Sequence, residues 1–498
     1  MDPFYGKPYG LVKGEERVTV ATVLVGAVLI LNILFAIAII FLERRDVRST
    51  WAWLIVLLFI PVIGFILYLV FGRNLNGQKI FTWDEQLHKR FQKAIALQKE
   101  KFSQSEFWFQ DPILEENKQL ILMHLNNDQA ILTQDNHVEI FTDGKEKFDA
   151  LLKDLAEAQH HIHLIYYIIR HDELGKKIMD LLIQKAREGV GVRIIYDALG
   201  SRRLSKKWIQ KIRLAGGEVE AFFPARLPLF NLRLNFRNHR KLVVIDGKIG
   251  YIGGFNIGNE YLGLSTRFGY WRDTHLRITG TAVHQIQNRF ILDWSQASYQ
   301  DISFQDGYYP EPEQQGDLGI QIVSSGPDSE WEQIKNGYIK MILTAKKYVY
   351  IQTPYFIPDD SLLDALRMAA LSGIDVRIMI PNKPDHPFVY WATYSYIGEL
   401  LKAGGKVYIY QNGFLHAKTI VVDDQIASVG TANIDMRSFR LNFEVNAFLY
   451  HAHTVRQLAS IIHKDTLQST VLTYEGYLER SFSVRFKESI SRLLSPIL

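Results

Sequence analysis

Cysteine is absent from this chain of 498 residues. The chain therefore has no disulfide, no thiol nucleophile and no cysteine-ligated metal site, which is compatible with a cytosolic environment. An excess of one charge is also lacking: 57 Lys and Arg stand against 53 Asp and Glu, and the net charge of +4 says little about partners. A further absence is local, because two stretches near the N-terminus contain no charged residue.

The two uncharged stretches are Val18–Leu42, with 25 residues, and Trp51–Phe71, with 21 residues. At about 1.5 Å per residue, a helix of either length would cross a hydrocarbon core of roughly 30 Å. A cleaved signal peptide is disfavoured, because the first run is too long and a second run follows it directly. We expect residues 1–73 to form a tail and a two-helix transmembrane hairpin, with helices at about 18–42 and 51–71 and a kink at Pro61.

Basic residues flank this expected hairpin unequally. Eight lie beyond its two ends and three lie in the connector, which favours both ends on the cytoplasmic side of the cell membrane. The chain would then be a multi-pass membrane protein with its main part on the cytoplasmic face. The eight are Lys7, Lys13, Arg17, Arg73, Lys79, Lys89, Arg90 and Lys93, and the three are Arg44, Arg45 and Arg48.

One pattern, H-x-K-x4-D-x6-G-[GT]-x-N, occurs twice without a gap. The first copy has His239, Lys241, Asp246, Gly253, Gly254 and Asn256. The second has His416, Lys418, Asp423, Gly430, Thr431 and Asn433. A single His-x-Lys means little, but two ungapped copies that agree at all these positions indicate a shared function.

The residue types suit chemistry on a phosphate. The four residues between Lys and Asp are apolar or β-branched and predict buried strands, so that His and Lys, at i and i+2, share one face. Lysine binds phosphate oxygens, while imidazole can attack phosphorus or move a proton near neutral pH. The glycine turns and their Asn would approach the same phosphate. We expect each Asp to orient or charge-stabilise a His rather than to touch substrate. Two surface strands with solvated charges would not explain the repeated spacing.

Internal duplication extends beyond the motifs. Each copy is preceded by an apolar strand, a helical stretch, a Gly-x-x-Val-Arg strand and an Ala-Gly-Gly turn, at 161–217 and again at 348–405. Alternating strands and helices predict a largely parallel or mixed sheet covered by helices. We expect a helical connector at 74–130, a first half at 131–300, a linker at 301–318 and a second half at 319–498 that ends in a helix.

The paired motifs resemble the double HKD signature of the phospholipase D superfamily. The resemblance implies an α/β fold of two phospholipase D-like halves related by pseudo-twofold symmetry, with one motif from each half in a single active site. It also implies a phosphohistidine intermediate and neither a metal nor another cofactor. By analogy, His239 would be the nucleophile and His416 the acid and base, although the sequence does not break the symmetry between them.

The chain resembles bacterial cardiolipin synthases in segments spread over nearly its whole length. They include Glu43–Trp53, Gly253–Tyr261, Trp271–His275, Thr353–Asp359, Gly430–Phe439 and the ending Ser491–Leu498. The resemblance implies that two phosphatidylglycerol molecules yield cardiolipin and glycerol, without a nucleotide. Gly254 departs from the serine of many superfamily members, whereas Thr431 keeps a hydroxyl. A water-excluding site at the membrane would favour a lipid alcohol over water as acceptor.

Other functions remain open at this point. A membrane phospholipase D would use water as acceptor, and a nuclease would share the HKD chemistry but would not need the apolar N-terminus. A non-enzymatic lipid-binding scaffold gives no reason to keep both His and Lys sets. We expect phospholipid substrates and an anionic membrane as partners, and no nucleic acid. The alternative donor and acceptor lipids, the acyl-chain preference and the oligomeric state, a homo-oligomer included, stay undetermined.

Two acidic residues are candidates for positioning the histidines. Glu444 lies eleven residues after Asn433 and resembles an acidic residue of the family, and Asp273 would be its first-half counterpart. A carboxylate at a strand edge is more often a structural hydrogen-bond partner. Three histidines lie close together in the sequence, at His160, His161 and His163. They stand at the start of an apolar strand, and no carboxylate cluster is nearby, so a structural role is favoured over metal binding.

A basic and aromatic stretch, residues 222–238, contains no acidic residue. Such a composition indicates an interfacial loop that inserts apolar side chains and holds anionic headgroups. The membrane-interface candidates are Phe223, Phe230, Leu232 and Arg233. The competing interpretation is a core loop with solvated arginines.

Overall fold

The computed structural model describes residues 12–42, 47–61, 63–68, 72, 80–81, 84–224, 235–300, 302, 305–312 and 316–495, and within the first helix it describes the side chains of 22–38. The chain divides into two compact units. The first comprises Met1–Leu75 with Ala225–Asn235, and the second comprises Asn76–Pro224 with Phe236–Leu498.

The predicted transmembrane hairpin is wrong. In the part of the chain that the structure describes, no helix is both long enough and apolar enough to cross a membrane. The second uncharged stretch is broken near Pro61 into α2 (Val47–Phe59) and α3 (Ile63–Leu67), because proline cannot donate the next helical hydrogen bond. The 13 residues of α2 span about 20 Å. α1 runs from Val12 to Leu42.

The first unit has a small core of its own. Leu57 of α2 and Tyr68 are buried together, with Phe35 of α1 packed against them. The lone amide of the first apolar run, Asn32, donates its Nδ2 hydrogen to the carbonyl oxygen of Leu57 over 2.6 Å. This contact ties α1 to α2.

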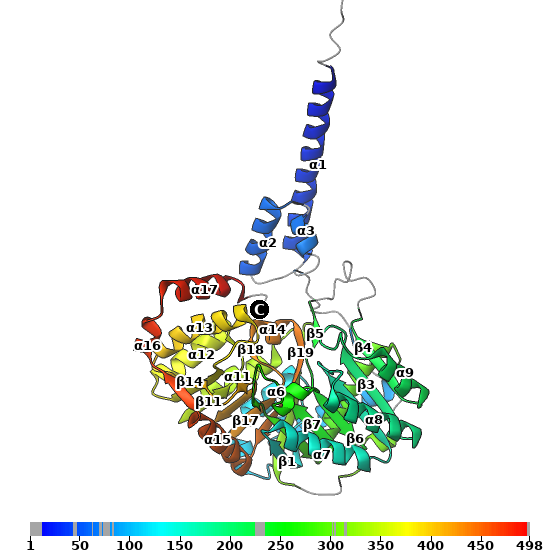
Figure 1. The fold of residues 1–498 in the computed structure, drawn as a ribbon. Helices are drawn as coiled ribbons and strands as arrows, with labels where there is room; N and C mark the ends of the chain where they lie inside the picture. The colour runs from blue at the N-terminus through cyan, green and yellow to red at the C-terminus, as the bar shows by residue number, and fades with distance from the viewer. Residues whose placement is uncertain are drawn as a thin grey trace, which may run out of the picture. The chain divides into compact units, whose positions relative to one another are not determined.

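The second unit is built on one 16-stranded mixed sheet (Figure 1). The first half contains β1 (Thr133–Phe141), α7 (Gly144–Glu157), β2 (His161–Tyr166), α8 (Glu173–Arg187), β3 (Gly191–Asp197), α9 (Lys206–Leu214), β4 (Glu218–Phe222), β5 (Arg237–Asn238), β6 (Leu242–Ile245), β7 (Ile249–Gly253), β8 (Trp271–Arg272), β9 (His275–Thr279) and α10 (Ala282–Ser298).

The second half repeats this order and adds elements at its end. It contains β10 (Leu318–Ser325), α11 (Gln333–Thr344), β11 (Tyr348–Gln352), β12 (Phe356–Ile357), α12 (Asp360–Leu371), β13 (Asp375–Pro381), α13 (Pro387–Lys402), β14 (Lys406–Tyr410), β15 (Phe414–Leu415), β16 (Thr419–Val422), β17 (Ile426–Gly430), β18 (Ile434–Asp435), α14 (Met436–Arg440), β19 (Asn442–Tyr450), α15 (Ala452–Thr466), β20 (Ser469–Leu472), α16 (Tyr474–Leu478) and α17 (Phe482–Leu493).

Strand order shows the pseudo-twofold relation between the halves. From the centre outward the first half runs β1-β9-β7-β6-β2-β3-β4, and the second runs β10-β19-β17-β16-β11-β13-β14, with β20 added at its edge. The equivalent strands β1 and β10 pair antiparallel at the centre, as a twofold axis between them requires. The expectation of two α/β halves with a mixed sheet agrees with this topology.

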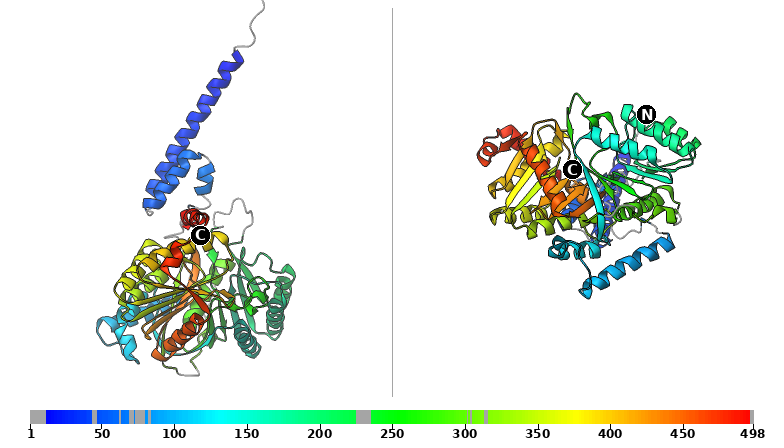
Figure 2. Two further views of the ribbon diagram at one scale, coloured as in Figure 1. Left: turned by 60° about the vertical axis from the view of Figure 1, so that its left-hand side comes forward. Right: turned by 90° about the horizontal axis from the view of Figure 1, so that it is seen from below.

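Helices cover both faces of the sheet (Figure 2). Alternate residues of β2 point to opposite faces: Ile162 and Leu164 enter the core with α7 and α8. His163 points to the other face and stacks on Phe290 of α10, with ring centroids 4.2 Å apart. His161 Nε2 lies 3.0 Å from Gln287 Oε1, which indicates a structural role for this histidine cluster.

The segments expected as connector and linker both pack against the halves. Asp84 caps α4 (Glu85–Ser103), and the stretch after it divides into α5 (Pro112–Glu116) and α6 (Lys118–Asn127). Leu114, Leu120 and Ile121 from these short helices are buried in the core of the second half. In the described part of 301–318, the buried Tyr308 accepts a hydrogen bond from Arg193 Nη1 over 2.9 Å.

Candidate active site

Two short strands carry the motif histidines into the opposite half. β5, which leads into His239, pairs with β19, and β15, which leads into His416, pairs with β8. The backbone N–H of His239 donates to Phe443 O over 3.0 Å, and that of His416 donates to Arg272 O over 2.7 Å. Each motif therefore begins on the edge of the other half.

Each histidine meets a carboxylate from the other half. His239 Nδ1 lies 2.9 Å and 3.0 Å from the two carboxylate oxygens of Glu444, and His416 Nδ1 lies 2.6 Å from Asp273 Oδ2. Strand register makes the two carboxylates equivalent. Gly253 is opposite His275 and Gly430 is opposite Asn446, and each carboxylate stands two residues before that partner.

The motif lysines lie beside the histidines. Lys241 Nζ donates to His239 O over 2.6 Å, while Lys418 Nζ donates to His416 O and lies 2.9 Å from His416 Nδ1. Lys418 also contributes to lowering the pKa of His239, and Lys241 contributes to lowering that of His416. These cross-effects mean that the two motifs form one charged cluster.

Burial sets the protonation of the cluster. It lowers the pKa of His239 to about 4, against the opposing effect of Glu444, and it lowers the pKa of His416 together with Lys418. Burial likewise lowers the pKa of Lys241 to about 7 and of Lys418 to about 8. Near neutral pH both imidazoles are uncharged. Because Nδ1 carries the hydrogen that each imidazole donates to its carboxylate, the nitrogen with the free lone pair is Nε2. Such a nitrogen can act as nucleophile or as base.

The carboxylates themselves stay ionised. Burial acts to raise the pKa of Glu444, but His239 and Lys241 outweigh it and hold that pKa below its usual range. Lys418 and His416 do the same for Asp273 against its burial. Each ionised carboxylate can stabilise the imidazolium that forms when its histidine gains a proton or a phosphoryl group.

The motif aspartates have a different role from the one expected. Asp246 accepts hydrogen bonds from the backbone N–H groups of Gln159, His160 and His161 at 2.8, 2.8 and 2.9 Å. Asp423 accepts in the same way from Lys347 and Tyr348, each at 2.8 Å. Neither contacts a motif histidine among the hydrogen bonds of the described chain. The expectation that they orient the histidines is wrong, because the turn after β6 or β16 directs them to the start of β2 or β11.

The glycines of the motif turns leave space for the carboxylate of Asp273 and for the backbone of the neighbouring strand. A Cβ on Gly254 would lie 1.9 Å from Asp273 Oδ1, so a side chain there would displace the partner of His416. Gly253 and Gly430 are equally crowded, with a Cβ 2.5 Å from His275 Cα and 2.3 Å from Asn446 Oδ1 respectively. Thr431 occupies the place of Gly254, and its Oγ1 accepts from Val445 N over 2.9 Å.

The two motif asparagines differ in their contacts. Asn256 accepts a hydrogen bond from Ile168 N over 3.1 Å and donates to Tyr261 OH over 3.1 Å, so its amide is used within the first half. Asn433 is buried, and its Oδ1 has no hydrogen-bond partner in the described structure. A direct phosphate contact by Asn256 is therefore not supported.

Several neighbours of the histidines were not found from the sequence. The ring of Tyr167 lies 4.9 Å from that of His239, and Trp271 lies 5.2 Å from His416. Arg240, between His239 and Lys241, forms a buried ion pair with Asp293 at 2.7 Å. Strand order could have suggested Tyr167, because it directly follows β2, the neighbour of β6.

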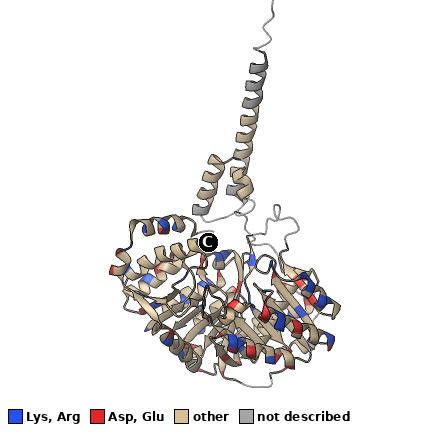
Figure 3. Ribbon diagram, in the orientation of Figure 1, with Lys and Arg blue, Asp and Glu red and all other residues tan. Residues whose placement is uncertain are grey.

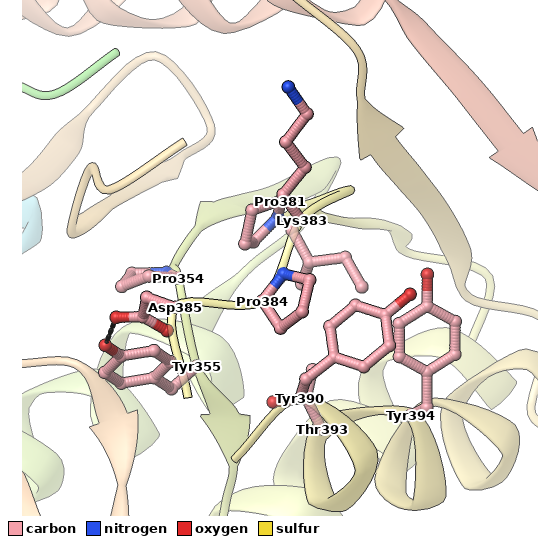
Figure 4. Close-up of a pocket in the computed structure, with 10 residues that line it drawn as sticks. Pro354, Tyr355, Pro381, Lys383, Pro384, Asp385, Tyr390, Thr393 and Tyr394 are labelled. Atoms are coloured by element: carbon pink, nitrogen blue, oxygen red, sulfur yellow. Dashed lines mark hydrogen bonds between the residues drawn. The ribbon is translucent and has the colours of Figure 1, made fainter. Parts of the chain in front are cut away.

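The second half has a small pocket lined by residues of α13 and of the segment after β13 (Figure 4). Tyr390 and Tyr394 of α13 line it beside Pro384, and the hydroxyl of Tyr355 donates to Asp385. Asp385, one of the lining residues, acts to raise the pKa of Lys418.

One membrane-interface candidate, Phe223, lies among the described residues. Phe223 is 6% exposed and packs against Phe222 and Phe443, with ring centroids 4.5 Å and 5.9 Å away. The interfacial role expected for Phe223 is wrong, because its ring belongs to the protein core. Phe230, Leu232 and Arg233 lie outside the described residues.

The crossed His–carboxylate pairs bring the two motifs and their lysines into one cluster, whose residue types suit group transfer at phosphorus. A family model described as cardiolipin synthase, PLD-like domain, matches residues 151–294 and 338–466. A second, described as phospholipase D-nuclease N-terminal, matches residues 30–73. The crystal structure of a phosphatidylserine synthase from Haemophilus influenzae has a similar fold, with a TM-score of 0.59 and 17% identity over 76% of this chain and 100% of that one.

Two curated relatives narrow the class. The chain is 60% identical to the major cardiolipin synthase ClsA of Bacillus subtilis over 96% of its own length and 100% of the relative. It is 59% identical to a cardiolipin synthase of Listeria monocytogenes over 94% of its own length and 98% of the relative. The chain therefore belongs to the bacterial cardiolipin synthases of the phospholipase D superfamily, and it is an enzyme.

Proposed function

We propose that this enzyme transfers the phosphatidyl group of one phosphatidylglycerol to a second, giving cardiolipin and free glycerol. The observation that carries the proposal is the pair of crossed contacts, His239 with Glu444 and His416 with Asp273, in a chain 60% identical to a cardiolipin synthase. The exchange breaks one phosphodiester bond and makes another, so it needs no nucleotide.

In the first step, His239 Nε2 attacks phosphorus and the bond to the glycerol oxygen breaks. His416 gives its proton to that oxygen, and free glycerol departs. The phosphatidyl group is then bonded to His239 Nε2. The pKa of His239, lowered to about 4, keeps this nitrogen unprotonated for attack. The anionic phosphate favours the protonated form of His416 that the step requires.

In the second step, His416 takes the proton from the terminal hydroxyl of another phosphatidylglycerol. The resulting oxygen attacks phosphorus and displaces His239, so that both histidines return to their first state. Lys241 and Lys418 would hold the phosphate oxygens throughout, as positive charges beside the developing negative charge. The assignment of His239 as nucleophile is part of the proposal.

Phospholipid substrates place the reaction at a membrane surface. The basic residues near the N-terminus favour the cytoplasmic leaflet, whose anionic lipids attract Lys and Arg. Water must be kept from the phosphatidyl-histidine, because hydrolysis would give phosphatidic acid instead. The site is suited to this, since both motif histidines are buried.

The test uses purified full-length protein in phosphatidylglycerol vesicles with a chelator present. Cardiolipin and glycerol are expected in equal amounts, and both should be lost in His239→Ala and in His416→Ala. The matched control is His453→Ala, at an exposed position on α15, which should keep full activity. Phosphatidic acid with glycerol would show a hydrolase, and no lipid turnover would refute the proposal. The reaction is stopped during turnover, and the peptides are analysed by mass spectrometry with and without acid treatment. A phosphatidyl group on the His239 peptide that acid removes would identify His239 as the nucleophile.

A further inference from the structure

The C-terminal helix α17 exposes its apolar side. Phe482, Phe486, Ile490 and Leu493 recur at three- and four-residue spacing, which places them on one face of the helix. Phe482 and Leu493 are each 77% exposed and Phe486 is 58% exposed. A row of exposed apolar side chains at this spacing marks a contact surface rather than scattered surface residues.

The polar side of α17 is the side that packs against the protein. Glu488 is 4% exposed and Ser491 is 1% exposed. Glu488 forms an ion pair of 2.9 Å with Arg480, and the guanidinium of Arg492 lies 4.6 Å from the ring of Tyr396 on α13. This orientation is the reverse of that of an ordinary surface helix, whose apolar side faces the core. Polar contacts thus hold the helix with its apolar face outward.

Charge identifies the occupant of that face. Figure 3 shows basic residues along α17. Arg485 and Lys487 are exposed, and the single acid of the helix, Glu488, is buried. Apolar side chains flanked by lysine and arginine suit an anionic lipid surface, where the rings enter the interface and the cations meet phosphates. A twofold contact between copies of this chain would set these like charges against each other.

The helix also packs on α13, which lines a pocket of the second half. α17 lies along α13 (Figure 1), and Tyr390 and Tyr394 of α13 line the pocket that contains Asp385. Asp385 in turn acts on Lys418. A bilayer against α17 would therefore lie on the side of the second half where α13 lines this pocket.

We propose that α17 is an interfacial helix that inserts Phe482, Phe486, Ile490 and Leu493 into an anionic phospholipid surface and seats the catalytic halves on it. The proposal rests on the proposed function in one respect, because that function supplies the anionic phospholipid. The helix lies in the surface plane and does not cross the bilayer.

The absence of native cysteine allows a direct test on the full chain. Ser489→Cys places a single thiol within the apolar face, and Ser372→Cys, just after α12, is the matched control. Each is labelled with an environment-sensitive fluorophore and mixed with phosphatidylglycerol or phosphatidylcholine vesicles. A blue shift and quenching by brominated lipid are expected at position 489 alone, and more strongly with phosphatidylglycerol. No shift at 489 would overturn the proposal.

Substitution separates this proposal from the proposed function. Removing two inserted rings in Phe482→Ser/Phe486→Ser should weaken vesicle binding through α17 by about tenfold or more per ring. Turnover of vesicle phosphatidylglycerol should fall, whereas turnover of monomeric short-chain phosphatidylglycerol should not. The control Leu214→Ser/Leu467→Ser removes two exposed leucines elsewhere and should change neither. Unchanged turnover of vesicle phosphatidylglycerol in the Phe482→Ser/Phe486→Ser variant would refute the proposal. So would a molar mass in solution, without lipid, that is half that of the wild type, because the apolar face would then join two copies of the chain. Failure of the wild type on both substrates, with the fluorescence shift retained, would instead refute the proposed function alone.

Discussion

Replacing Glu444 by Gln tests whether the carboxylate on His239 assists the reaction. Glu444 is 0% exposed, and its two oxygens lie 2.9 Å and 3.0 Å from His239 Nδ1. Glutamine keeps the shape and one acceptor oxygen but removes the negative charge. The imidazolium that forms when His239 takes the phosphatidyl group then loses its counter-ion.

The size of the effect follows from the contact. A hydrogen bond to a charged group is worth about 1.5–3 kcal/mol, which corresponds to roughly 10- to 150-fold in rate. Glu444 also acts to raise the pKa of Lys241, which is about 7 with the carboxylate present. Without Glu444, Lys241 loses its proton at lower pH, so the loss of activity should be larger at pH 8 than at pH 6.

The assay is the initial rate of glycerol release at both pH values, with thermal unfolding measured in parallel. Glu139→Gln, at an exposed position of β1, is the matched control and should leave the rate unchanged. A folded Glu444→Gln enzyme with the wild-type rate at both pH values would refute the reasoning. Asp273→Asn should give a loss of similar size, because strand register makes the two carboxylates equivalent.

Three further predictions follow from the geometry. Asp246→Asn should lower the free energy of unfolding by about 1–3 kcal/mol, since its carboxylate accepts three backbone hydrogen bonds, yet the folded enzyme should keep its kcat; a large loss of kcat at unchanged stability would contradict the structure. The profile of kcat/KM against pH should fall as pH rises through the lowered pKa values of Lys241, about 7, and Lys418, about 8, because the cations bind phosphate; a flat profile to pH 10 would exclude this role. Gly254→Ser should reduce both activity and melting temperature, because its Cβ would lie 1.9 Å from Asp273 Oδ1; wild-type values for both would show that the turn can shift.

Much of the fold could be predicted because its signals are local. Four-residue apolar runs after each His-x-Lys form β6 and β16, which are fully buried at the middle of each half. Repeated strand and helix patterns predicted two equivalent halves, and strand order agrees with that prediction. Such patterns are legible because side-chain direction repeats every two residues in a strand and every 3.6 in a helix.

The N-terminal error has a different origin. A count of uncharged residues measures apolar length, but it does not measure helix length. Pro61 interrupts the second stretch, so that α2 has 13 residues where the composition suggested 21. Composition misled in the same way at Phe223, since an aromatic residue in a basic stretch can equally enter a core.

By itself, the sequence determined which residue types the active site has: a pair of His and a pair of Lys at matching spacing, on buried strands. Only the tertiary structure decided which carboxylates serve them. Asp246 stands seven residues from His239 in the chain but turns away to the start of β2, whereas Glu444, 205 residues away, meets the imidazole. The physical reason is that strand pairing between the halves, β5 with β19 and β15 with β8, sets these contacts, and that pairing depends on register across the pseudo-twofold axis rather than on spacing along the chain.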